Sequence, residues 1–208
     1  MSANTAVATL SQLSWTEAMM PVRKLHSFYL AALCGLLLVG VPCMAAAQVV
    51  GKVTRVQKQA QVGSTPAANG TPVSMNQVIR TGAGARLRIT FRDGTSLTLG
   101  ENARIVVNRY VYNPASSTGV LALNASRGAF RFATGKISTM SNKKVTVTTP
   151  VATLGVRGTE FWSGTVPGYN THGVLLLSKT GKVDVRNRAG SVTLSRQGEG
   201  TDLPAFGE

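Results

Sequence analysis

The sequence has few of the side chains that enzymes and metalloproteins use for chemistry. Of its 208 residues, two are cysteines, two are histidines and eight are acidic. Both cysteines, Cys34 and Cys43, lie before residue 48, so residues 48–208 contain none. Thiol catalysis, thiolate metal sites and disulfide frameworks are therefore excluded for those 161 residues, which must be held together by a hydrophobic core.

The remaining titratable residues form no catalytic or metal-binding pattern. His172 is the one histidine of residues 48–208, and its glycine-rich surroundings predict a solvent-facing loop residue, since a metal site needs several ligands. Asp184, Glu199 and Asp202 lack the spacing of a calcium loop. No phosphate-binding glycine loop, zinc signature or nucleophile elbow is present. We therefore expect no enzymatic activity, no metal and no cofactor.

Long hydrophobic runs are also scarce, and the clearest covers residues 28–41. Arg23 and Lys24 precede it, and a triplet of alanines follows it ahead of Gln48. A basic start, a short apolar centre and a small-residue end predict a secretory signal peptide over residues 23–47, cleaved near Ala47-Gln48. An uncleaved membrane anchor is the alternative, although a run of 14 residues is short of the roughly 20 that span a bilayer.

This leader predicts an exported, periplasmic protein whose mature chain has no transmembrane span. Residues 1–22 are polar and small, and we interpret them as an N-terminal extension from an early start codon. Residues 48–208 carry 20 basic and 7 acidic side chains, a net charge of +13, which predicts attraction to polyanions. Export argues against nucleic acid as the partner.

The basic residues are also explained by strand geometry. Arg86, Arg88 and Arg92 alternate with apolar residues, as on a half-buried strand with a solvated outer face. A period of two with turn residues every eight to twelve positions continues through residues 49–201, which predicts an all-β domain. We expect a twisted antiparallel β-sandwich or a short β-solenoid-like stack, preceded by a signal-peptide helix.

Turn signals divide this domain into strands. Residues 85–91 and the return strand from residue 97 flank Asp93-Gly94, the strongest hairpin signal in the chain. We expect loops over residues 63–72, 113–119 and 164–173, a mobile segment over 139–144, and a short apolar link over 73–80. The last three strands are expected at residues 174–177, 183–185 and 192–194.

Residues 148–163 are the most distinctive stretch. Pro150, Gly155 and Gly158 interrupt it, and two glycines three apart indicate backbone angles or close approaches that a side chain would forbid. This pattern predicts a strand that bends, bulges and resumes. Glu160 is expected to pair with Arg157 or with an arginine of a neighbouring strand, and a glycosidase role is disfavoured because no second carboxylate lies nearby.

This stretch resembles the signature of the FecR domain family. The resemblance rests on Thr149-Pro150-Val151-Ala152 and on Leu154-Gly155-Val156-Arg157-Gly158-Thr159-Glu160-Phe161. A second block, Phe91-Arg92-Asp93-Gly94-Thr95, precedes it in the family's order. The resemblance covers about residues 50–201, within a domain that we expect at residues 48–208.

The resemblance implies a periplasmic, non-catalytic β domain, such as the sensor half of an envelope signalling system. FecR-type regulators have a cytoplasmic anti-sigma segment before a membrane helix. Only residues 1–22 precede the predicted signal peptide here, so we do not expect a direct anti-sigma role.

Two partners remain open. One is an envelope protein that adds a strand to an exposed sheet edge; the other is an anionic envelope polymer such as an acidic glycan, peptidoglycan or lipopolysaccharide. A component of a surface or secretion assembly is a third, minor interpretation. The candidate residues, for which a purely structural role is equally open, are Pro150, Gly155, Arg157, Gly158, Thr159, Glu160, Phe161, Asp93 and Gly94.

Aromatic residues are few, and they allow two interpretations. Trp162, Tyr169, Tyr110 and Tyr112 could form a stacking platform for sugars beside basic residues. The alternative, which we favour, places them in the core, half-buried or at a strand edge, because aromatic side chains commonly fill such positions.

Overall fold

The computed structural model describes residues 48–166 and 169–204. The chain divides into two compact units, residues 1–45 and 46–208, and the described residues belong to the second. The predicted extension and signal peptide lie outside them. None of the helices in the described ranges is long and apolar enough to cross a membrane.

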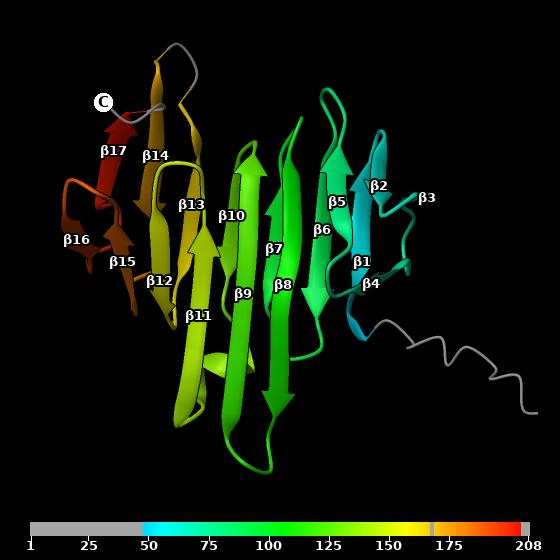
Figure 1. Ribbon diagram of the computed structural model, residues 1–208, viewed down its shortest axis with the longest axis horizontal. Helices are drawn as coiled ribbons and strands as arrows, with labels where there is room; N and C mark the ends of the chain where they lie inside the picture. Colours follow the sequence, from blue (N-terminus) through cyan, green and yellow to red (C-terminus); the bar gives the residue numbers. More distant parts are fainter. Residues whose placement is uncertain (1–47, 167–168, 205–208) are drawn as a thin grey trace, which may run out of the picture. The chain divides into compact units, whose positions relative to one another are not determined.

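Two large β-sheets make up this unit, and the prediction of an all-β fold is confirmed (Figure 1). We call the eight-stranded sheet, with its strands in the order β17-β14-β13-β10-β7-β6-β1-β4, sheet A. Its strands are β1 (Val49–Gln57), β4 (Pro72–Ser74), β6 (Arg86–Phe91), β7 (Ser96–Leu99), β10 (Phe130–Ala133), β13 (Glu160–Thr165), β14 (Thr171–Leu176) and β17 (Gly200–Pro204).

The nine-stranded sheet, in the order β16-β15-β12-β11-β9-β8-β5-β2-β3, is sheet B. Its strands are β2 (Ala60–Val62), β3 (Thr65–Pro66), β5 (Val78–Thr81), β8 (Arg104–Asn113), β9 (Thr118–Arg127), β11 (Asn142–Thr148), β12 (Thr153–Arg157), β15 (Lys182–Arg186) and β16 (Ser191–Leu194).

The chain advances along the sandwich by alternating between the sheets. The hairpin β6–β7 lies in sheet A, β8–β9 in sheet B, β11–β12 in sheet B, β13–β14 in sheet A and β15–β16 in sheet B. In Figure 1 the colours accordingly run from cyan at one end of both sheets to red at the other. The N-terminal strands therefore form one end of the sandwich and the C-terminal strands the opposite end.

A single hydrophobic core lies between the sheets, because the period-two pattern of each strand points its apolar residues inward. In sheet A the rings of Phe130 and Phe132 pack on Phe161, with centroids 5.9 and 5.6 Å apart. All three phenylalanines are buried. On the opposite face Arg86, Arg88 and Arg92 are exposed, as the alternation predicted.

A buried polar cluster joins the sheets at the predicted Asp93-Gly94 hairpin. The Asp93 side chain accepts hydrogen bonds from Thr95 Oγ1 at 2.6 Å and from the Tyr110 hydroxyl of sheet B at 3.1 Å. Gly94 has φ of +85°, which explains the glycine. The short 3-10 helix η2 (Lys136–Thr139) caps the cluster, with Lys136 N donating to Asp93 O at 2.8 Å.

Burial and the nearby carboxylate act together on the tyrosine of this cluster. Tyr110 is 2% exposed, and desolvation first, then the Asp93 charge, raises the pKa of its hydroxyl well above the ordinary value. The hydroxyl therefore remains a neutral donor to Asp93, and the pair has the character of a structural link.

Several predicted segments differ from the structure. Residues 139–144 are not one mobile segment, because they end η2 and begin β11, which pairs with β9 in parallel within an otherwise antiparallel sandwich. Residues 73–80 contribute β4 and β5 rather than a link. A last strand, β17, follows the three that were expected. Its sequence, Gly-Thr-Asp-Leu-Pro, has Leu203 as its only large aliphatic side chain, so no hydrophobic alternation indicated it.

Candidate functional site

The distinctive stretch at residues 148–163 is not one bent strand. Thr149–Ala152 is a turn, β12 follows in sheet B, and β13 begins in sheet A, so the chain changes sheets near Gly158. A local sequence pattern cannot distinguish a bulge within one strand from a crossing between two sheets, which explains the error. The crossing separates the stretch into parts with different surroundings.

Thr149 closes the turn with its own side chain. Its hydroxyl accepts from Ala152 N at 3.1 Å and donates to Ala152 O at 3.0 Å, while Thr149 N donates to Ala152 O at 2.8 Å. Pro150 supplies the φ that a turn requires at its second position, and it remains exposed. The sequence Thr-Pro-Val-Ala thus specifies a rigid turn between β11 and β12.

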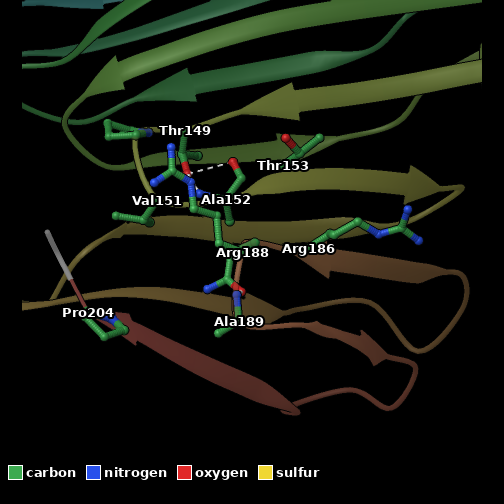
Figure 2. Close-up of a pocket in the computed structure, with 10 residues that line it drawn as sticks. Thr149, Val151, Ala152, Thr153, Arg186, Arg188, Ala189 and Pro204 are labelled. Carbon is green, nitrogen blue, oxygen red and sulfur yellow. Dashed lines mark hydrogen bonds between the residues drawn. The ribbon is translucent and has the colours of Figure 1, made fainter. Parts of the chain in front are cut away.

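This turn forms one wall of a cleft of about 820 Å³ at the C-terminal end of the sandwich (Figure 2). The opposite wall is the β15–β16 turn, and β17 contributes Pro204. The lining residues are Thr149, Pro150, Val151, Ala152, Thr153, Arg186, Asn187, Arg188, Ala189 and Pro204. Two arginines and no acidic residue line the cleft, so its charge favours an anionic group.

The two arginines take different directions. In Figure 2 the Arg188 side chain extends toward the turn at residues 149–152, whereas Arg186 points away from it. Both side chains are exposed, and neither forms an ion pair with a residue that the structure describes. Asn187 shapes the turn that presents them, because its Oδ1 accepts from Ala189 N at 2.9 Å and Gly190 N at 3.1 Å.

Tight backbone packing fixes the crossing between the sheets. Gly158 has φ of +64°, in the region that favours glycine. A Cβ on Gly181 would lie 2.2 Å from Gly158 O and 2.5 Å from Arg157 O, so no side chain fits between these segments. Thr134 Oγ1 adds a hydrogen bond to Thr159 O at 2.9 Å. The crossing is therefore held by main-chain contacts from two neighbouring segments.

The two charged residues beside the crossing do not pair with each other. Arg157 forms an ion pair with Asp184 of β15 at 2.9 Å, and Glu160 pairs with Arg131 of β10 at 2.6 Å. The predicted alternative, an arginine of a neighbouring strand, is the arrangement found for Glu160. In each pair the arginine is exposed and the carboxylate partly exposed, so each contributes about 1 kcal/mol or less.

The other candidate residues have structural surroundings. Gly155 has ordinary strand geometry, and a Cβ there would meet its nearest atom, Asp184 Cβ, at 3.6 Å, so neither backbone angle nor space requires glycine. Phe161 is in the core, and Thr159 is buried with an Oγ1 that has no hydrogen-bond partner among the described residues. Asp93 and Gly94 belong to the hairpin and do not line the cleft.

His172 is not the solvent-facing loop residue that we predicted. It lies in β14, is 8% exposed, and its Nε2 is 2.8 Å from Ser163 Oγ. Burial lowers the pKa of its imidazole, so the neutral ring is favoured. No carboxylate among the described residues orients this ring, so the pair lacks the third group of a serine hydrolase triad.

The aromatic residues do not gather into one platform. Tyr110 is buried in the hairpin cluster, Tyr112 packs against the core from sheet B, and Tyr169 is 71% exposed after β13. Trp162 alone lies on the outer face of sheet A, half-buried. In addition, the described residues contain no group of three or more metal-ligating side chains.

Sequence reasoning missed the cleft's second wall. Arg188 and Ala189 fall between the strands expected at residues 183–185 and 192–194, and Pro204 lies beyond the last expected strand. They reach the Thr149 turn because β12 pairs with β15 in antiparallel register, Thr153 opposite Arg186. No local signal carries that pairing, since the two strands are separated by the whole β13–β14 hairpin.

The chain is similar to a known protein family and to solved structures. The family model described as FecR protein matches residues 77–175, which confirms the resemblance. Two crystal structures of a candidate anti-sigma factor from Parabacteroides distasonis ATCC 8503 are 20% identical to this chain, with TM-scores of 0.45 and 0.44. Each covers 62% of this chain, which spans 60% of theirs. No curated protein matches in sequence.

Proposed function

We propose that residues 48–208 form an exported, non-catalytic module of envelope signalling that binds an extended, acidic segment of a partner protein. The match to the FecR family supports a regulatory role. The observation that carries the binding mode is the C-terminal end of the sandwich, where an unprotected edge strand adjoins a cleft lined by two arginines.

The free edge belongs to β16. Asn187 N donates to Gly190 O at 2.9 Å, and antiparallel pairs alternate between hydrogen-bonded and non-hydrogen-bonded from that point. The main-chain groups of Ser191 and Thr193 therefore point away from β15 and are available to an added strand. β-Augmentation uses such groups for affinity, and neighbouring side chains select the sequence.

The charges at this end select the chemistry of the partner. Arg186 and Arg188 line the cleft, and the unit as a whole is strongly basic. An acidic segment would be attracted on approach and would find cationic partners beside the strand edge. The proposal requires no cofactor and no catalytic group at this end. The ligand is the bound segment of the partner protein.

Site-specific photocrosslinking in cells of the native host tests the proposal. A photoreactive amino acid replaces Val192 of β16, which is 42% exposed, and in a matched protein it replaces Thr65 of β3 at the other end. We expect a protein adduct from position 192 and none from position 65. Equal adducts from both positions, or none from 192, would overturn the proposal.

Two substitutions make the test sharper. Ser191→Pro removes a main-chain donor from the free edge without removing a ladder bond, and we expect it to reduce the adduct at least about tenfold. Arg188→Ala is expected to reduce it about fivefold, while Arg92→Ala, an exposed arginine in the loop after β6, serves as its control.

The second candidate function is binding of an anionic envelope polymer, favoured by the net charge of +13 and by the exposed arginine row of β6. It predicts sedimentation with polysaccharide that high salt abolishes and that Ser191→Pro leaves unchanged. That result, together with no adduct at position 192, would replace the first proposal with the second.

A further inference from the structure

Trp162 lies across two glycines on the outer face of sheet A. Its neighbours Phe161 and Ser163 point into the core, so the indole points the other way. A Cβ on Gly164 would be 3.2 Å from Trp162 Cζ2, and one on Gly173 would be 3.2 Å from Trp162 Cζ3. The six-membered ring therefore occupies the space above both strands.

Close packing explains these glycines, and the ring is only part of it. An added Cβ on Gly164 would lie 2.6 Å from Ala129 Cα, and one on Gly173 would lie 3.0 Å from Val166 Cγ2, both closer than the indole. Neither Gly164 nor Gly173 has a positive φ, so another residue could adopt either conformation. Gly164 also admits Ala129, whose Cβ would be 2.4 Å from an added Cβ. The result is a partly exposed aromatic surface on a strand pair whose register, Gly164 opposite Gly173, places the two gaps together.

Both polar and apolar side chains of neighbouring strands lie beside this ring. Asp202 of β17 lies opposite Gly173, and its Oδ1 is 3.3 Å from the same point that a Gly173 Cβ would occupy. No described residue hydrogen-bonds or ion-pairs with the Asp202 carboxylate. Arg131 lies directly opposite Trp162 in β10 and is bound to Glu160. Leu175, 37% exposed, lies opposite Trp162 in β14.

We propose that Trp162 and Asp202 form a binding site for one residue of a neutral saccharide. The electron-rich face of an indole attracts the C–H groups on one face of a pyranose ring. Carboxylate and guanidinium groups at its rim can accept from and donate to the sugar hydroxyls. A flat apolar surface with polar groups beside it matches that ligand.

The charged side chains around the indole favour a neutral sugar over an anionic one. The unit carries a net charge of +13, but the charged groups around the ring are two carboxylates, Asp202 and Glu160, and one guanidinium, Arg131. An acidic saccharide would meet an unpaired carboxylate here, which costs affinity. This site is therefore distinct in chemistry from the arginine-lined cleft, and it does not rest on the proposed protein partner.

Tryptophan fluorescence reports the site directly. The chain has two tryptophans, Trp15 and Trp162, so the full-length Trp15→Phe protein has its only indole on sheet A. The probes are chitotetraose, cellotetraose and maltotetraose, with heparin as the anionic comparison. We expect a saturable change in emission with at least one neutral probe and none with heparin. No saturable change with any of the three would overturn the proposal, as would saturation by heparin alone.

Calorimetric titration of variants separates binding from stability. Trp162→Ala is expected to weaken binding at least tenfold. Because that change also uncovers the glycines, Asp202→Asn is the decisive variant: it removes no contact with a described residue, so its melting temperature should not change, while affinity should fall about fivefold. Val192→Ala, an exposed apolar residue of sheet B, should bind normally. Unchanged affinity in Asp202→Asn would show that Trp162 only covers the glycines.

Discussion

The edge strands at the two ends of the sandwich differ in length and in the position of proline. At the N-terminal end the edges are β3, two residues long, and β4, three residues long, and each contains a proline, Pro66 and Pro72. At the C-terminal end the edges are β16 and β17, four and five residues long, and the one proline, Pro204, is the last residue of its strand. Short, proline-containing edges resist the addition of another strand.

This difference indicates which end is available for recognition. A sheet edge that can accept a strand is also a route to aggregation, so proteins commonly block edges that they do not use. One end here is blocked, and the other combines an open edge, an arginine-lined cleft and the crossing at Gly158. The comparison supports the proposal that binding takes place at the C-terminal end, while the N-terminal edges are protected.

The largest expected effect is a loss of stability when a closely packed glycine of the C-terminal end is substituted. Gly181→Ala at the C-terminal end must displace the backbone at Gly158, in addition to straining φ of +84°. We expect a loss of about 4 kcal/mol in unfolding free energy from overpacking and strain together. Urea denaturation measures it.

The controls for this substitution share its strain but not its clash. Gly198→Ala at the same end and Gly70→Ala at the other have φ of +80° and +89°, and an added Cβ meets nothing within 4 Å. Each should lose about 1 kcal/mol. A Gly181→Ala protein as stable as these two would show that the crossing is not held by close backbone packing.

Removal of the edge prolines should make the N-terminal edges able to accept an added strand, as we propose for the C-terminal edge. The double variant Pro66→Thr, Pro72→Thr restores two main-chain donors to β3 and β4. We expect slow self-association, measured by sedimentation velocity at increasing concentration, with little change in the melting temperature. The matched change Pro204→Thr in β17 should have less effect, because it restores one donor at a strand terminus. Monomers at all concentrations would contradict the protective role.

The smallest effect concerns pH and the buried histidine of the C-terminal end. Because burial lowers the pKa of His172, the unfolded chain takes up a proton before the folded one as pH falls below about 6.5. Stability is therefore full above that pH and is lost progressively as pH falls toward the lowered value. Melting temperatures from pH 8 to 5 should show a decline that His172→Gln reduces. Identical declines in both proteins would show that His172 does not cause the loss of stability.

Much of this fold is predictable from the sequence because its signals are local. The alternation in residues 85–91 and the Asp93-Gly94 turn determine a hairpin with no reference to the rest of the chain. His172 was misassigned although a signal existed: it continues the inward alternation of Val174 and Leu176, and the neighbouring glycines outweighed it. The cleft was not predictable, because Arg188 meets the Thr149 turn only through pairing of strands far apart in sequence.

The stepwise course of the chain along the sandwich has a consequence for biogenesis. Synthesis starts at the N-terminus, so β1 to β10 can pair while the last strands are still being made. The cleft, the open edge and the ring over Gly173 all require strands that emerge last. A polypeptide whose translation or export stops early would therefore lack the cleft and the open edge on which the proposed binding depends.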